Sequence, residues 1–579
     1  MAQAKKVVRK SRKTKEVNNT QAVNNIEATG IEKPVETPIA VSQKPIIEMP
    51  PIKHTGLLFI VALILGWLSD FLFWEQVFGL NVPLFLTVCL AGGVYWLVSS
   101  GFKPSRQSLF LLIPFLFFGF ASFTRREPLT SFLAYMFTFI SLGLFATSYR
   151  GGYWIFYGLS DYARKLLMLL FDVVIQPIQF ITQLRKDPSS DNLLSKSSPL
   201  WGLLRGLIVT LPIVWCFGTI LASADIVFDQ KLDEFFEDFS ENTQRFITIL
   251  ICAYFLIGVF LHSILKSEDK KFDEESKPFL KPFVGFIEAS VILVGVSLLF
   301  ASFVSVQFQY FFGGENNIGV AGFTYSQYAR RGFNEMLVVA FFSLVLILGL
   351  STLTKRQNEN QKRIYSVFNI VLVTLVMIIL VSAYQRVELG IGWHGYSRLR
   401  LYPKIFLVWL ALLFITVAVL ELVRRQKFFA FAALMASFGF GASLYFFNID
   451  DAIIERNVHR AWNGKNLNVP HLASLSDDAI PMLAREFFYN ENLPEETRQG
   501  LGAALACYRY FEERPHTTTY DWRSYNWSSS QAEQTLDSVR PHLASYIVRY
   551  DKWPVSVKTP DGNLYECILR DSELYENEE

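Results

Sequence analysis

The sequence predicts an all-α polytopic membrane protein: a bundle of about eleven transmembrane helices, followed by a mostly helical soluble C-terminal domain that ends in a small β-hairpin. Of the 579 residues, 51% are hydrophobic and only 18% are charged, whereas about a quarter of the residues in soluble domains are charged. The apolar residues also come in blocks of bilayer length, which short charged loops separate. Several soluble cores would spread them more evenly along the chain.

The polar N-terminal segment, residues 1–52, has a cluster of Lys and Arg ahead of a stretch rich in Val, Thr, Pro and Glu. It contains too little apolar surface to form a core, so we expect a disordered tail. No apolar run follows the basic cluster closely enough for a cleavable signal peptide. The tail is therefore expected to be a basic cytoplasmic extension.

About eleven segments are long and apolar enough to cross a hydrocarbon core of ~30 Å at ~1.5 Å per residue. The first transmembrane block, residues 53–149, holds four of them: 55–74, 82–98, 108–123 and 130–148. The second block, residues 202–447, holds seven: 202–223, 246–263, 285–307, 334–353, 365–384, 404–422 and 428–447.

The segment between the two blocks, residues 150–201, is interpreted as a cytoplasmic amphipathic segment and linker. Its apolar stretch 166–181 contains Asp172 and Pro177 and has Lys and Arg at both ends. These polar residues and flanking cations favour a helix that lies in the membrane interface over one that crosses the bilayer. Crossing is the alternative.

Lys and Arg gather in alternate loops, and by the positive-inside rule this pattern predicts a cytoplasmic N-terminus. The acidic stretch 225–241 then lies outside the membrane, together with two basic exceptions, Arg125-Arg126 and the loops that hold Arg330 and Arg398. With an odd number of spans, the C-terminal domain, residues 448–579, is extracytoplasmic. One additional span would place it in the cytoplasm.

The C-terminal domain has its own helix and turn signals. Helices are predicted to begin at Ser476, at Pro494 and at Ser530. Alternating residues about the turn 560–562 predict the hairpin. A separate helical domain of this kind is a candidate protein-binding module.

Two cysteines, Cys507 and Cys567, fall in the C-terminal domain. An even pair in an extracytoplasmic domain can form a disulfide, and we predict that bond. Two buried free thiols are the alternative.

Carboxylates within or at the ends of apolar segments are the first candidates for function. An intramembrane carboxylate is costly unless it faces a polar interior or a partner. The candidates are Asp70, Asp225 and Glu288. Glu288 lies only a few residues into its span, so an interfacial carboxylate explains it equally well.

Arg, Tyr and His residues concentrate in two outer loops next to span ends. Guanidinium groups bind phosphate or carboxylate through paired donors, so loops that converge would form an anion site. Anchoring to lipid headgroups or pairing with nearby carboxylates is the alternative, and it is the commoner role of interfacial Arg and Tyr. The candidate anion- or headgroup-binding residues are Tyr325, Tyr328, Arg330, Arg331, Arg386, Glu388, His394, Arg398 and Arg400.

Other chemistries lack support in the sequence. The seven His and five Cys show no metal-ligand spacing, and no Walker A or GxSxG motif is present, so we expect no metal and no cofactor. Residues 390–395 match GxGxxG but lie between two spans instead of in a βαβ unit, which excludes a dinucleotide site. The basic tail beside a membrane indicates topology or contact with anionic lipid, and we expect no nucleic acid partner.

Several segments after residue 50 form a recognisable pattern. They are SADIVFD at 223–229, QFQYFFGG at 307–314, TYSQYARRGFNEML at 324–337, SAYQRVELGIGWHGYSRLRLY at 382–402, and NIDDAIIERNVHRAWNGKNLNVPHLASLSDDAIP and YDWRSYNWSS in the C-terminal domain. This pattern resembles a bacterial membrane family known as domain of unknown function 4173, a neighbour of family 4153. The resemblance implies a multi-pass protein of the bacterial cytoplasmic membrane, and it implies no activity, because the family has none assigned.

Three functions remain open. The separate helical domain favours a non-enzymatic envelope platform or sensor whose outer domain binds a partner protein. The second is a transporter or lipid-handling protein that recognises an anionic group through the outer arginines, although no inverted repeat is visible. The third is a membrane enzyme acting on an outer-leaflet substrate, with His394 or Glu388 as general base. The lipid bilayer is the partner that composition itself requires, and the sequence sets no oligomeric state.

Overall fold

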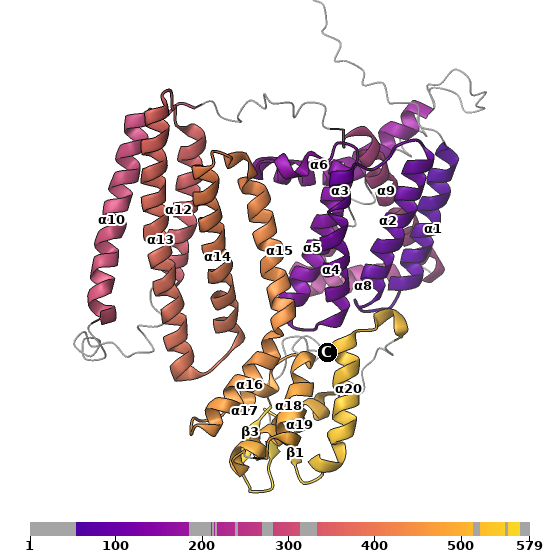
Figure 1. Ribbon diagram of the computed structural model, residues 1–579. Helices are drawn as coiled ribbons and strands as arrows, with labels where there is room; N and C mark the ends of the chain where they lie inside the picture. The colour runs from indigo at the N-terminus through magenta and orange to yellow at the C-terminus, as the bar shows by residue number, and fades with distance from the viewer. Residues whose placement is uncertain are drawn as a thin grey trace, which may run out of the picture. The chain divides into compact units, whose positions relative to one another are not determined.

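A computed structural model describes residues 54–184, 210, 214, 217–237, 241–268, 282–312, 333–491, 493–512, 521–550 and 554–567 (Figure 1). Its long apolar helices are α1 (Thr55–Phe73), α2 (Asn81–Ser99), α4 (Leu112–Thr124) preceded by the short α3 (Arg106–Leu109), α5 (Pro128–Ser148), α6 (Leu159–Leu184), α9 (Glu241–Leu265), α10 (Phe286–Phe312), α12 (Phe333–Leu353), α13 (Glu359–His394), α14 (Arg398–Leu422) and α15 (Phe429–Phe447). The shorter connecting elements are α8 (Ile226–Glu237) and the 3-10 turns η1 (Tyr153–Phe156) and η4 (Gln426–Phe428).

The predicted fold class is confirmed. Eleven helices in the described part of the chain are long and apolar enough to cross a membrane, and ten of them coincide with predicted spans. The eleventh, Leu159–Thr182, belongs to α6. The predicted span 202–223 lies mostly outside the described residues, although 217–224 are helical.

Helix α6 runs across α5 and α9 instead of alongside them (Figure 1). Two contacts show the crossing: the Tyr254 hydroxyl donates to the Val174 carbonyl, and His262 Nδ1 lies 2.8 Å from Asp172 Oδ2. The two α9 residues are more than two helical turns apart, whereas their partners on α6 lie within one turn. A Cβ on Gly258, between these contacts, would come within 2.2 Å of the α6 backbone, so glycine permits the close crossing. A helix lying across its neighbours is what an interfacial α6 requires.

Loop contacts sort the helix ends into two sets. In the first set, Arg150 after α5 pairs with Glu268 after α9 (2.7 Å), and Phe156 of η1 packs against Phe428 between α14 and α15 (ring centroids 5.5 Å apart). The ends of α5, α9 and α14 therefore lie together.

The second set of helix ends contacts the C-terminal domain. Arg523 Nη1 donates to the Phe71 carbonyl at the end of α1 (2.6 Å), and Ser524 Oγ donates to Gln76 (2.8 Å). Gly79, ahead of α2, packs so tightly on the backbone of Ser524 that a Cβ would lie 2.5 Å from its carbonyl oxygen. The α1–α2 connection is therefore fixed to the domain.

The C-terminal domain is mostly helical, as predicted. Its elements are α16 (Ile449–Trp462), α17 (Val469–Ala473), η5 (Asp477–Ala479), α18 (Ile480–Tyr489), α19 (Glu495–Glu512), η6 (Trp522–Ser524), α20 (Trp527–Val539), η7 (Arg540–Leu543), β1 (Ile547–Arg549), β2 (Ser556–Lys558) and β3 (Leu564–Glu566). Helix α20 begins earlier than predicted, because the Asn526 side chain caps it by accepting the Ser528 N–H (3.0 Å).

The predicted hairpin is β2–β3, and a third antiparallel strand, β1, extends it to the order β1-β2-β3. Val557 of β2 is opposite Val548 on one side and Tyr565 on the other. A disulfide joins Cys507 of α19 to Cys567 beyond β3, with Cα atoms 5.6 Å apart. The bond ties the sheet to the helices.

The hydrophobic core continues across residue 448. Phe137 of α5 and Leu401 of α14 belong to the same buried cluster as Ile453 of α16 and Leu483 of α18. The left-handed conformation of Asn448 (φ 37°), which Asn tolerates better than most residues, turns the chain from α15 directly into α16. The domain therefore packs on the span ends and is not suspended from a linker.

Candidate functional site

The structure distributes the predicted anion-binding residues over three places. Those outside the described residues are Tyr325, Tyr328, Arg330 and Arg331. Arg386 and Glu388 lie on α13, where the Glu388 carboxylate pairs with Lys404 of α14 (2.5 Å). The remaining three, His394, Arg398 and Arg400, lie around the α13–α14 connection, beside the C-terminal domain.

Arg398, the first residue of α14, forms a two-pronged ion pair with Asp450 of α16. Its Nε lies 2.8 Å from Oδ1 and its Nη2 lies 2.5 Å from Oδ2. Asp450 is fully buried, and Ser476 adds its backbone N–H (2.9 Å) and its hydroxyl (2.6 Å) as donors to Oδ2. A buried carboxylate needs this full set of partners. The charge of Arg398 is thus balanced within the protein.

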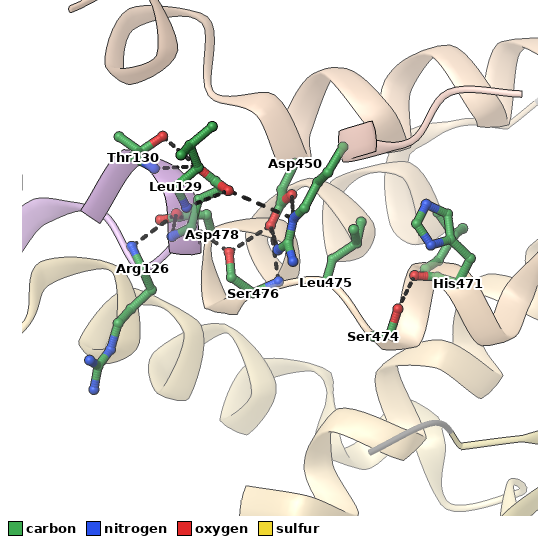
Figure 2. A network of polar contacts seen from close by, with 12 residues as sticks. Arg126, Leu129, Thr130, Asp450, His471, Ser474, Leu475, Ser476 and Asp478 are labelled. Atoms are coloured by element: carbon green, nitrogen blue, oxygen red, sulfur yellow. Dashed lines mark hydrogen bonds and ion pairs between the residues drawn. The ribbon is translucent and has the colours of Figure 1, made fainter. Parts of the chain in front are cut away.

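The α4–α5 loop joins the same network (Figure 2). Asp478 Oδ2 accepts the backbone N–H groups of Arg126 (3.0 Å) and Glu127 (2.7 Å), while the Arg126 side chain points away from the network. Glu127 in turn caps α5 by accepting the Thr130 N–H (2.7 Å), and the Tyr402 hydroxyl of α14 donates to it. The starts of α5 and α14 are therefore fixed to one carboxylate-rich centre.

Two acidic groups at this centre have raised pKa values. Burial raises the pKa of Asp451 to about 7, and the carboxylates of Asp478 and Asp450 act in the same direction against Arg125. Burial likewise raises the pKa of Asp478. Burial therefore shifts both carboxyl groups toward their protonated forms.

The α13–α14 loop is clamped by α16. The Asn457 side chain bonds both backbone groups of Tyr396, accepting its N–H (2.9 Å) and donating to its carbonyl (2.8 Å). Gly395 ends α13 with φ 84°, and a Cβ there would lie 2.4 Å from Nη1 of Arg460. Arg460 Nη2 donates to the Gly392 carbonyl (2.9 Å). The glycine thus leaves room for the Arg460 guanidinium at the loop.

A cavity of about 1100 Å³ lies between this loop, the start of α5, and helices α16 and α17. Its cationic and imidazole side chains are His394, Arg398, Arg400, Arg460, Lys465 and His471, its exposed apolar side chains are Phe132, Trp393 and Leu399, and no Asp or Glu is among the described residues that line it.

Two cations of the cavity, Arg460 and Lys465, come from the C-terminal domain. Neither Arg460 nor Lys465 pairs with a carboxylate in the described part of the chain. His471 adds no charge, because burial and then the nearby Arg398 lower its pKa and keep the imidazole neutral at pH 7. Arg460 and Lys465 are therefore the cations best able to bind an anion.

Arg460 and Lys465 were not among the predicted site residues, because those predictions were confined to the loops between spans and these two cations lie in the C-terminal domain. A pattern does mark them: Gly464 (φ 80°) ends α16 and separates the two cations by one tight turn, in the segment HRAWNGK. Only the fold brings this turn next to Arg400, which donates to the Gly395 carbonyl (3.0 Å).

The three candidate intramembrane carboxylates lie apart from the cavity. Asp70 of α1 is buried and pairs with Arg245 of α9 (2.8 Å). Asp225, which directly precedes α8, is exposed and accepts the N–H of Phe228 in the first turn of that helix (3.0 Å). Glu288 is also exposed, and it accepts the Gly285 N–H at the start of α10 (2.9 Å). The last two therefore cap helix starts.

No group of three or more His, Cys, Asp or Glu suitable for a metal ion occurs among the described residues. Glu388 and His394, the two candidate bases, line different cavities, because Glu388 belongs to a smaller one of about 610 Å³ beside Tyr396. The two alternative general bases therefore face different cavities.

Eleven apolar helices and an apolar core shared with the C-terminal domain define a multi-pass membrane protein. The chain belongs to the family described as domain of unknown function DUF4153, whose model matches residues 112–486. The sequence resemblance pointed first to family 4173 and placed 4153 beside it; the matching model is that of 4153. No curated protein and no solved structure matches the chain.

Replacing Asp450 with Ala should lower the unfolding free energy by about 3 kcal/mol or more, because it leaves Arg398 without its buried partner. Glu359→Ala, which breaks the exposed pair with Arg424, should cost less than about 1 kcal/mol. Thermal unfolding of the purified protein measures both. Equal shifts in melting temperature for the two variants would show that the buried pair contributes no more to stability than the exposed one.

Asp451→Asn should remove a pH dependence of stability. The folded state keeps the Asp451 proton up to about pH 7, whereas the unfolded chain loses it near its ordinary value of 3.8. The stability from this proton is therefore complete below pH ~4 and is lost as the pH rises to ~7. We expect Asp451→Asn to raise the melting temperature by about 5 °C at pH 8 and little at pH 4. A difference independent of pH would contradict this account.

Proposed function

We propose that this protein binds an anionic group of the phosphate class at the outer surface of the bacterial cytoplasmic membrane, as a lipid-handling or transport protein would. The observation that carries the proposal is that Arg460 and Lys465 line the same cavity, and that no carboxylate is among the described residues lining it. Guanidinium offers planar paired donors and ammonium a point charge, a combination suited to phosphate oxygens.

The size of the cavity indicates more than a lone anion. Its volume of about 1100 Å³ slightly exceeds the roughly 1,000 Å³ of the largest typical pockets for organic ligands. Neutral polar side chains, Asn466 and Asn468, line it as well. The proposed ligand therefore carries its anionic group on a larger organic molecule.

An outer location for the cavity is supported by a parity argument. Helix α5 ends on the side of the bundle away from the C-terminal domain, where Arg150 pairs with Glu268 after α9. Helix α9 begins on the side next to that domain, where Arg245 pairs with Asp70 near the end of α1. The proposed topology therefore requires an odd number of bilayer crossings between residues 149 and 240. Because α6 lies across its neighbours, the segment 202–223 is the proposed crossing. Ten other spans and this one give eleven, which puts the N-terminal tail and the C-terminal domain on opposite sides, and the positive-inside rule then favours a cytoplasmic tail.

The topology is tested with Gln534→Cys in α20 and Gln357→Cys ahead of α13, two exposed positions at opposite ends of the spans. In intact cells, a membrane-impermeant maleimide should label Cys introduced at 534 and spare Cys introduced at 357 until the membrane is permeabilised. The reverse pattern would place the C-terminal domain in the cytoplasm.

The platform hypothesis is compatible with this function, because the C-terminal domain supplies both cations. A domain that closes over an anion can report occupancy to a partner protein. The continuous core between Leu401 and Ile453 provides the mechanical connection that such a sensor would use.

Arg460→Ala and Lys465→Ala should each weaken binding of phosphatidylglycerol about tenfold, since each removes a charged donor. Arg485→Ala and Lys558→Ala, on the same domain but away from the cavity lining, are the matched controls. Native mass spectrometry of protein released from nanodiscs counts the bound lipid. Unchanged retention in both cavity variants would refute the proposed anion site.

A further inference from the structure

We infer that the bound anion is the headgroup of a membrane lipid, which enters the cavity sideways from the bilayer between α5 and α14. The inference rests on the proposed function and adds the source of the ligand. A soluble phosphate ester, arriving from the aqueous side, has the same anionic chemistry and is the competing source.

One wall of the cavity consists of apolar side chains that belong to the spans. Phe132, Leu399 and Trp393 are 61%, 85% and 64% exposed, and each also lines the cavity. Phe132 lies one helical turn inside the candidate span Pro128–Ser148. An exposed side chain inside a span, such as Phe132, faces lipid, and Trp393 and Leu399 at the ends of α13 and α14 extend this apolar surface to the headgroup layer.

The opposite wall is polar and comes from the C-terminal domain. Arg460, Lys465 and Asn468 belong to the α16–α17 region, beyond the ends of the spans. Cations therefore lie on the aqueous side of the cavity and apolar surface on the membrane side. This polarity matches an amphiphile with its headgroup outward and its chain in the leaflet.

The bilayer boundary also reaches the C-terminal domain at a second point. The half-exposed ring of Trp522 lies 6.4 Å from the ring of Phe71, which is inside the span of α1. Arg523 stacks on the same Phe71 ring (5.5 Å to its centroid). Trp at this depth is typical of the headgroup layer. The domain therefore rests on the membrane surface, and its cavity does not open only to bulk water.

The test compares two ligands that share a phosphate ester, phosphatidylglycerol in nanodiscs and soluble glycerol 3-phosphate. The wild-type protein should bind the lipid at least ~100-fold more tightly, because only the lipid buries acyl surface. A Phe132→Ala, Leu399→Ala double variant should lose about tenfold in lipid affinity and leave glycerol 3-phosphate binding unchanged.

Phe139→Ala with Leu412→Ala is the control, since both residues are exposed on the same two helices but do not line the cavity. Equal affinities for the two ligands, or equal effects of the two double variants, would overturn the lateral-entry inference. If Lys465→Ala still weakened glycerol 3-phosphate in that case, the anion site itself would stand. If Lys465→Ala left the affinities for both ligands unchanged, the proposed function itself would be refuted.

Discussion

The ion pair between Arg398 and Asp450 closes the contact between the spans and the C-terminal domain. It joins the start of α14 to the start of α16, and through Ser476 it reaches the segment that holds Asp478. Asp478 then fixes the start of α5 through the Glu127 N–H. A buried pair stabilises little in itself, because desolvation offsets its attraction. Its importance is geometric: with either partner removed, the helix starts that form the cavity would lose their common anchor.

Sequence reasoning could predict the parts of the fold that depend on local composition. Apolar length identified the spans, and the polar residues of 166–181 set α6 apart as a predicted interfacial helix, although its length and composition also suit a span. It could not predict that Arg398 would be balanced by Asp450, or that Lys465 would replace it as the available cation. Those outcomes depend on which residues meet across the α13–α14 loop, and sequence separation conceals them. Strand β1 was missed for a different reason: it is only three residues long, and no turn signal like the one at 560–562 joins it to β2.

The site divides its charges by depth. Buried carboxylates hold the helix starts together, and burial raises the pKa values of Asp451 and Asp478 among them. At the end of α16 and in the turn after it, Arg460 and Lys465 give the cavity positive charge that no carboxylate among the described lining residues balances. The first group supports structure and the second is free to attract a ligand. Both lie at the ends of the spans, where a lipid headgroup and a C-terminal domain can meet.

An experimental structure of the full chain in nanodiscs that contain phosphatidylglycerol tests the central claim most directly. We expect headgroup density between Arg460 and Lys465, with an acyl chain leaving the cavity past Phe132 into the same leaflet. The Arg398–Asp450 contact should be intact in that structure. A C-terminal domain detached from the span ends, or a cavity from which lipid is absent while annular lipid is resolved nearby, would contradict the account.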